Sequence, residues 1–320
     1  MCCRPFEISW TERSRSLTAG RCAGVKSECV QKTRLYGTSD GGRTIQDITP
    51  AAASALEAAR RHGPILVGTG EGFDKCSADT LANMQTWWAG SPYFDINIYI
   101  GGASRACSQQ NLTASWVNQV LSLGWRLIPT WVGPQAPCNA FSHKISSDPA
   151  LADMQGSSEA LAASDAAAAL GLSAGVIYYD MEYYSPSDQS CDAAVKGFVN
   201  GWVRGLHSRN QVAGVYGSPL DAPDWATVAS PPDAVWLAKW DNRATVWGLN
   251  PLSDSLWNNR NRLHQFMGGH NETWGGVTFN IDRDVEYGPV MGAVPQHPRT
   301  GLRPTEAGSG TGAAGSRDQR

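Results

Sequence analysis

The sequence lacks long apolar runs and any excess of positive charge. No stretch approaches the roughly 18 to 20 consecutive apolar residues that a membrane-spanning helix needs. The 320 residues carry a formal net charge of -3, and no long run of Lys or Arg supplies the basic patch that nucleic-acid binding usually requires. The composition therefore argues against a transmembrane segment and against a nucleic-acid partner.

Several motifs that bind cofactors or metals are also missing. No G-x-G-x-x-G turn follows the first apolar run, which argues against a dinucleotide-binding sheet. The Gly pairs at 101–102 and 268–269 precede no Lys-Ser/Thr, so tight turns are the simpler interpretation. His264 and His270 have no third His or Cys close by, so metal ligation is not expected there. The sequence predicts no cofactor and no metal.

The two ends of the chain lack sustained apolar periodicity. Residues 1–64 are rich in Arg, Ser, Thr and Gly, and they contain no apolar run of the kind found in a secretory signal. Residues 293–320 alternate Pro, Gly, Ser and Arg, and they cannot repay their ordering entropy by burial. We expect a poorly ordered leader or linker over 1–64, one domain over 65–292 and a disordered tail over 293–320.

Half of the eight cysteines lie in polar, loop-like contexts, and these are Cys76, Cys107, Cys138 and Cys191. Their spacings of 31, 31 and 53 residues fit no zinc-binding pattern. Disulfides, which persist in oxidising compartments, are favoured over unpaired thiols, and four cysteines allow three pairings. The remaining cysteines fall in the leader and receive no role: Cys2, Cys3, Cys22 and Cys29.

Between the two ends, apolar runs typical of strands alternate with helical patterns. The expected strands are Gly72–Lys75, Phe94–Gly101, Trp125–Val132, Val176–Glu182, Gln211–Tyr216, Ala234–Trp240, Leu263–Met267 and Val277–Asp282. The expected helices are Thr80–Ala89, Leu112–Leu123, Glu159–Leu170 and Ala193–His207. Such alternation predicts parallel pairing. Eight strands indicate an α/β fold, a (β/α)8 TIM-type barrel whose helices are abbreviated in the second half.

Four acidic residues fall at the ends of expected strands. Asp180 and Glu182 are two apart on one strand, so their side chains project the same way. Asp74 closes the first strand and Asp282 closes the eighth, and these strands become neighbours when the barrel closes. Because such barrels carry active sites at the carboxyl ends of their strands, we expect all four acids in one mouth. For each acid taken alone, the alternative is a helix cap or an ion pair.

Crowded carboxyls suit the cleavage of glycosidic bonds. Repulsion and partial burial should raise at least one pKa, and this chemistry needs one protonated and one ionised carboxyl. Four aromatic side chains at strand ends or in loops are candidates for stacking on sugar rings, with plain packing as the alternative: Trp131, Tyr183, Trp240 and Trp274. Four other Trp residues lie in helical patterns and are expected in the core: Trp87, Trp88, Trp116 and Trp202.

Four short segments resemble a bacterial glycoside-hydrolase-like domain of unassigned function, over roughly Gly70 to Gly288: Gly72-Phe-Asp-Lys-Cys76, Tyr99-Ile-Gly-Gly102, Asp180-Met-Glu182 and the stretch from His264 to Gly276. That domain is similar in layout to the glycoside hydrolase family 25 lysozymes. Those lysozymes carry an Asp on the first strand, Asp-x-Glu on the fourth and Asp on the eighth. The four acids named above match these positions.

The resemblance implies a role for each residue. Glu182 would protonate the leaving oxygen, Asp180 would stabilise the transition state, and Asp74 and Asp282 would support them. Gln265 resembles a hydrogen-bonding residue of the lysozyme mouth. The chain differs from those lysozymes in its four loop cysteines and in a longer Gly-Gly-His-Asn-Glu-Thr-Trp loop, expected to reshape the cleft.

The favoured function is therefore carboxylate acid/base hydrolysis of a cell-envelope polysaccharide such as peptidoglycan. One alternative is a catalytically inactive barrel that binds glycan through the same cleft, and another is an exported structural protein. Members of the resembled domain often carry an export signal, so a secreted or envelope-associated location is expected, although no signal is visible in this chain. The sequence predicts no particular oligomeric state.

Overall fold

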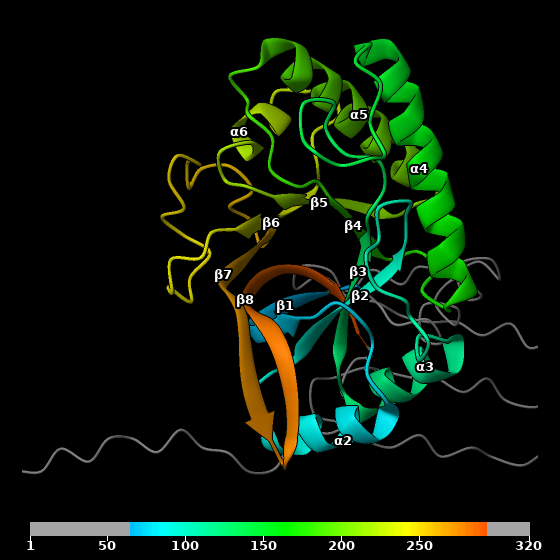
Figure 1. Ribbon diagram of the computed structural model, residues 1–320, viewed down its shortest axis with the longest axis vertical. Coiled ribbons are helices and arrows are strands. Elements are labelled where there is room, and N and C mark those ends of the chain that lie inside the picture. Colours follow the sequence, from blue (N-terminus) through cyan, green and yellow to red (C-terminus); the bar gives the residue numbers. More distant parts are fainter. Residues whose placement is uncertain (1–64, 293–320) are drawn as a thin grey trace, which may run out of the picture.

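The computed structural model describes residues 65–292, which form a closed eight-stranded barrel (Figure 1). In chain order the elements are β1 (Ile65–Asp74), α2 (Leu81–Gly90), β2 (Asp95–Gly101), α3 (Ala114–Leu123), β3 (Arg126–Trp131), α4 (Pro149–Ala169), β4 (Val176–Asp180), α5 (Gln189–His207), β5 (Val212–Gly217), α6 (Ala222–Trp225), β6 (Ala234–Ala238), β7 (Arg262–Trp274) and β8 (Val277–Met291). The predicted leader, the predicted tail and the leader cysteines lie outside the described residues.

The α/β barrel predicted from the sequence is confirmed, including its uneven helices. Helices α2 to α5 separate the first five strands, whereas α6 is a single turn and an irregular segment joins β6 to β7. The sequence explains the helix starts. Thr80, Thr113, Asp148 and Asp188 each precede a long helix and accept a backbone N–H of its first turn.

The predicted parallel pairing is correct for the first seven strands and wrong for the eighth. β8 runs antiparallel to both β7 and β1, and it continues to Met291 rather than ending at Asp282. The reason is the connection between β7 and β8. Only Gly275 and Gly276 separate the two strands, with φ of 58° and 82°, and a two-residue connection can join only antiparallel strands.

The segment expected as a loop after Gly268 is therefore the outer half of a long hairpin. β7 and β8 extend together beyond the barrel toward α2, as the two orange strands of Figure 1 show. The Trp87 Nε1–H donates to the carbonyl of Val277 over 3.0 Å and ties α2 to the hairpin. Because β8 is antiparallel, its first half reaches the barrel mouth, and this places Asp282 opposite Asp74.

Aromatic packing fills the space between β1, α2 and the hairpin. The rings of Trp87 and Phe279 stack with centroids 4.2 Å apart, and Phe73 packs beside both. Trp87, Trp116 and Trp202 are buried, as the helical patterns predicted. No helix within residues 65–292 has the length and apolar character needed to cross a membrane.

Helices α4 and α5 pack unusually close together. A Cβ atom on Gly201 would lie 1.9 Å from the carbonyl oxygen of Asp153, and one on Gly156 would lie 2.0 Å from that of Phe198. The two helices therefore meet backbone to backbone, and only residues without a side chain fit at the crossing.

Both predicted disulfides are present, and their pairing is now defined. Cys76 joins Cys107, linking the segment after β1 to the segment after β2. Cys138 joins Cys191, linking the segment after β3 to the first turn of α5. The first bridge lies at the barrel mouth, beside the cavity described next.

Candidate active site

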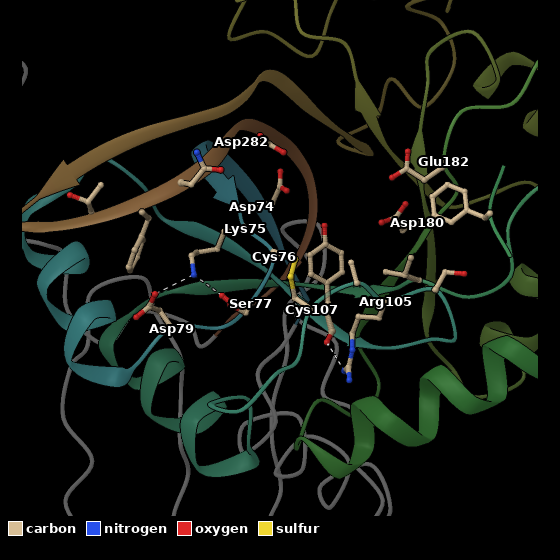
Figure 2. A pocket seen from close by; sticks show the side chains of 18 residues that line it. Asp74, Lys75, Cys76, Ser77, Asp79, Arg105, Cys107, Asp180, Glu182 and Asp282 are labelled. Atoms are coloured by element: carbon tan, nitrogen blue, oxygen red, sulfur yellow. Dashed lines mark hydrogen bonds and ion pairs between the residues drawn. A yellow bond between two sulfur atoms is a disulfide. The ribbon is translucent and has the colours of Figure 1, made fainter. Parts of the chain in front are cut away.

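The four predicted acids meet in one cavity of about 610 Å³ at the barrel mouth. Figure 2 shows Asp74 and Asp282 on one wall and Asp180 and Glu182 on the other. Asp74 ends β1 and Asp180 ends β4, whereas Glu182 lies two residues beyond β4. Four carboxyls from three parts of the chain therefore share one concave surface.

Asp74 is buried at 4 % exposure, and a glutamine holds its carboxyl. The Gln265 Nε2–H donates to Asp74 Oδ2 over 2.7 Å and lies 3.4 Å from Asp282 Oδ2. Burial and the charges of Asp282 and Glu182 raise the pKa of Asp74 to about 8, against the hydrogen bonds from Gln265 and Asp284, which lower it. Asp74 is therefore largely protonated at neutral pH.

Gln265 is the centre of a hydrogen-bond network at the mouth. Its Oε1 accepts from Tyr216 Oη–H over 3.1 Å and from Trp240 Nε1–H over 2.9 Å, while its amide donates to Asp74. These contacts fix which end of the amide faces the carboxyls. Gln265, which the sequence analysis proposed as a hydrogen-bonding residue of the mouth, thus lies between Trp240 and Asp74.

Asp180 and Glu182 are positioned by Gln135, a fully buried residue that sequence reasoning missed. The Gln135 Nε2–H donates to the Asp180 carbonyl over 2.7 Å, and Gln135 Oε1 accepts from the Glu182 backbone N–H over 2.9 Å. Gln135 lies in an irregular segment after β3, where no periodic pattern marks its role. One amide side chain thus sets the course of the chain that carries both acids.

The two acids differ in their surroundings. Asp180 is 6 % exposed, and its Oδ1 meets no hydrogen-bond donor among the described residues. Burial, followed by the charges of Glu182 and Asp74, raises its pKa well above the usual range. Glu182 is half-buried, and burial raises its pKa as well. Both side chains are thereby biased toward the protonated form.

Asp282 lies on β8, in the hairpin, and its pKa is subject to opposing influences. Burial raises its pKa, while the Gly269 backbone N–H and the charge of His270 lower it. In the sequence analysis, His270 was weighed only as a metal ligand together with His264, and metal ligation was not expected. His264 instead lies in the core, with its ring nitrogens 2.7 Å and 2.8 Å from backbone carbonyls, and no group of three metal-binding side chains occurs within 65–292.

Two of the four candidate aromatic residues are exposed and lie next to residues of the site, although neither lines the cavity itself. Trp240 is 65 % exposed, and one face of its ring covers Gly268, where a Cβ atom would come within 2.5 Å. Its other face is open, as stacking on a sugar ring requires. Tyr183, next to Glu182, is 54 % exposed.

The structure does not bring Trp131 or Trp274 to the cavity. Trp131 is buried and donates from Nε1 to Glu159 over 2.6 Å, packing over Gly101 on the outside of the barrel wall. Trp274 lies at the far end of β7 and donates from Nε1 to Glu272 over 3.0 Å. Each indole N–H is thus already hydrogen-bonded to a carboxylate away from the cavity, so these two side chains stabilise the fold and do not contact a ligand there.

Besides the four acids, the cavity is lined by other polar side chains. Its lining includes Lys75, Ser77, Arg105 and Asn280, beside the Cys76–Cys107 disulfide (Figure 2). The Lys75 ammonium donates to the Ser77 carbonyl over 2.7 Å and pairs with Asp79 at 3.2 Å. Sequence reasoning missed this part of the cavity because Lys75, Ser77 and Arg105 follow strands in connecting segments, and Asn280 lies on β8, where only Asp282 was considered.

The chain matches the family described as the Rv2525c-like, glycoside hydrolase-like domain over residues 85–286, a span that includes Asp180, Glu182 and Asp282. No curated protein matches the sequence. The fold is similar to that of the Tat-secreted protein Rv2525c of Mycobacterium tuberculosis, with 17% identity and a TM-score of 0.47 over 70% of this chain and 96% of that one.

Two further solved structures are similar in the same way. The Clostridium perfringens spore cortex lytic enzyme SleM is 14% identical, with a TM-score of 0.46 over 68% of this chain and 67% of its own. The Streptococcus pneumoniae protein GHIP, a glycosyl hydrolase 25, is 10% identical, with a TM-score of 0.43 over 73% of this chain and 92% of its own.

Proposed function

The chain belongs to the Rv2525c-like, glycoside hydrolase-like family, and on that premise we propose that its four-carboxyl cavity hydrolyses a cell-envelope glycan such as peptidoglycan. The observation that carries the proposal is the meeting of Asp74, Asp180, Glu182 and Asp282 in one cavity. Cleavage of a glycosidic bond needs a protonated carboxyl near the leaving oxygen and a second carboxyl near the anomeric carbon.

Glu182 is the best candidate for the general acid. It is the more exposed of the β4 pair, so a bound sugar can reach it, and burial still favours its protonated form. In the proposed reaction its proton passes to the glycosidic oxygen as the bond from that oxygen to the anomeric carbon breaks. Water then supplies a hydroxyl to the sugar and returns a proton to the site.

Asp180 is proposed to stabilise the positive charge that develops on the sugar ring. Asp180 lines the cavity and keeps 6 % of its surface exposed there, so its carboxyl lies on the wall that a bound sugar would meet. Asp74 and Asp282 support the pair from the opposite wall, held by Gln265. Trp240 is proposed as the sugar-stacking surface, and the exposed Tyr183, next to Glu182, as a second contact.

Two disulfides support a location outside the reducing cytoplasm, because such bonds persist in oxidising compartments. We therefore propose a secreted or envelope-associated protein. The domain proposed to act there spans residues 65–292.

The test compares the full chain with Glu182→Gln on purified peptidoglycan, measured by release of reducing ends. Removal of the general acid should lower the rate by about 10²- to 10⁴-fold. Glu159→Gln is the matched control, because Glu159 lies outside the cavity lining and a glutamine Oε1 still accepts from Trp131. Equal, background release by wild type and Glu182→Gln would refute hydrolysis of this polymer.

One observation favours a second candidate function, glycan binding without cleavage. The pKa is raised for all four cavity acids, whereas cleavage needs one of them ionised. In a binding protein, Glu182→Gln keeps the affinity for solubilised glycan, while Trp240→Ala weakens it about five- to tenfold. Unchanged affinity in Trp240→Ala would contradict this alternative.

A further inference from the structure

Strand β8 carries three acids on one face. Asp282, Asp284 and Glu286 alternate along the strand, so all three side chains project to the same side. Asp282 lies opposite Asp74 at the mouth, and Asp284 lies opposite Gly72, two residues deeper on β1. Asp284 is 0 % exposed and Glu286 is 2 % exposed. A buried column of carboxyls thus continues inward from the proposed active site.

The contacts of Asp284 require a proton. Its Oδ1 accepts from Trp236 Nε1–H over 2.8 Å. Its Oδ2 meets no N–H or O–H donor among residues 65–292, yet the side chain lies within hydrogen-bonding range of the Asp74 carboxyl. Two carboxyls can form a hydrogen bond only when one of them is protonated. Neither Asp284 nor Asp74 takes part in an ion pair within the described part of the chain.

The geometry decides which of the two carboxyls ionises first as the pH rises. Asp74 lies on the cavity wall and already accepts the Gln265 amide, which stabilises its ionised form. Asp284 is fully enclosed, and Trp236 supplies the only N–H that reaches its carboxyl from within residues 65–292. A charge on Asp284 would therefore cost more desolvation free energy than a charge on Asp74.

We propose that Asp284 is a positioning residue of this site, which keeps a proton inside the barrel and donates it in a hydrogen bond to Asp74. Together with the N–H donated by Gln265, this bond gives the Asp74 carboxyl two donors and so holds it in one orientation. We infer this bond from the enclosure of Asp284, its Oδ2 without an N–H or O–H donor, and the Asp74 carboxyl beside it. Its importance for turnover rests on the proposed hydrolase function.

The surroundings of the pair favour this proton placement. Any charge on Asp282, Asp180 or Glu182 would oppose a charge on this pair. Tyr99 and Tyr216 also face the pair, from β2 and β5. Burial first, and then the charge of Asp74, raise the pKa of Asp284 well above its usual range. The hydrogen bond from Asp284 has the opposite effect on its partner and lowers the pKa of Asp74.

Glu286 offers a matched control, because it repeats the arrangement one step deeper. Its side chain lies within hydrogen-bonding range of the Asp95 carboxyl, and Asp95 pairs with Arg126, whose Nε–H donates over 2.6 Å. Gly72 makes room for it, since a Cβ atom there would lie 2.3 Å from Glu286 Oε1. Glu286→Gln therefore changes the same kind of buried carboxyl without removing the bond to Asp74.

The test is a carboxyl-carbon NMR titration of the full chain, with the Asp74 signal assigned through Asp74→Asn. In wild type, the Asp284 carbon should keep the chemical shift of a protonated acid throughout the pH range in which Asp74 ionises. This measurement needs no variant of Asp284. Ionisation of Asp284 before Asp74 would overturn the proposal.

Two variants of Asp284 separate the hydrogen bond from packing. Asp284→Asn keeps an acceptor for Trp236 and supplies an N–H to Asp74, so the pKa of Asp74 should stay near 8. Asp284→Leu removes the donor and should raise that pKa by about 1 to 2, the effect of one hydrogen bond to a charged group. Glu286→Gln should leave it unchanged.

Equal Asp74 titrations in the Asn and Leu variants would refute the donated bond. So would a shift in Glu286→Gln as large as that in Asp284→Leu, because it would indicate a general effect of the barrel interior. None of these measurements requires turnover, so they decide the proposal even if the chain cleaves no glycan. Where glycan is cleaved, Asp284→Asn should retain the wild-type pH profile and Asp284→Leu should not.

Discussion

Asp74→Asn should make the protein more stable at neutral and alkaline pH, although it removes a residue of the proposed active site. Asp74 is 4 % exposed, and burial and neighbouring charges raise its pKa from 3.8 to about 8. An acid with a higher pKa in the folded chain binds its proton more tightly there than in the unfolded chain. Its contribution is therefore complete below the unfolded pKa and is lost as the pH rises toward the folded pKa.

The size of the stability change follows from the interval between the unfolded and folded pKa values of Asp74. Each pH unit between the two pKa values costs at most about 1.4 kcal/mol of unfolding free energy, so the rise from about pH 5 to about pH 8 costs roughly 4 kcal/mol. That is a large share of the roughly 5 to 15 kcal/mol that stabilises a typical domain. Asn has no proton to lose, and its Oδ1 can still accept the Gln265 amide.

Urea unfolding of the full chain at several pH values, followed by Trp fluorescence, measures this difference. The unfolding free energy of wild type should fall more steeply with pH than that of Asp74→Asn. The two slopes should differ by up to one proton, or about 1.4 kcal/mol per pH unit. Asp165→Asn is the control, because that carboxyl is exposed on α4 and 70% of its side chain is accessible. Parallel pH curves for wild type and Asp74→Asn would show that Asp74 is not protonated in the folded protein.

Two further predictions concern the scaffold. Gly201→Ala should lower the unfolding free energy by about 1 to 3 kcal/mol in a denaturant titration, because its Cβ would lie 1.9 Å from the Asp153 carbonyl oxygen. This loss is expected even though Ala is the better helix former. A stabilised variant would contradict the close approach of α4 and α5. Replacing both Cys138 and Cys191 by Ser should cost about 4 kcal/mol, because the bridge closes a sequence separation of 53 residues. An unchanged melting temperature under non-reducing conditions would show that this bridge does not stabilise the fold.

Local pattern was enough to predict most of the barrel. Strands such as Val176–Asp180 are buried along their whole length, and this produces the continuous apolar runs that mark parallel sheets in a sequence. The expected starts of α2 and α3 agree with the structure to within two residues, whereas α4 begins at Pro149, ten residues before its expected start at Glu159. Asp180 and Glu182 were predicted at the mouth because residues two apart on a strand share a face.

The prediction of Asp282 reached the correct place through an incorrect strand direction. Its position at the end of an apolar run was taken as the carboxyl end of a parallel strand. In the structure Asp282 lies within the first half of an antiparallel strand that begins at a two-residue turn. Asp284 and Glu286 were missed for the same reason, since the strand was expected to end before them.

What the sequence determined by itself was the order of strands and helices and the set of acids at the mouth. These depend on residues close together in the chain. Tertiary structure alone decided the direction of β8, the pairing of the cysteines and the contacts of Gln135, Gln265 and Asp284. The physical reason is distance along the chain: 191 residues separate Gln265 from Asp74, and only closure of the barrel brings them within 2.7 Å.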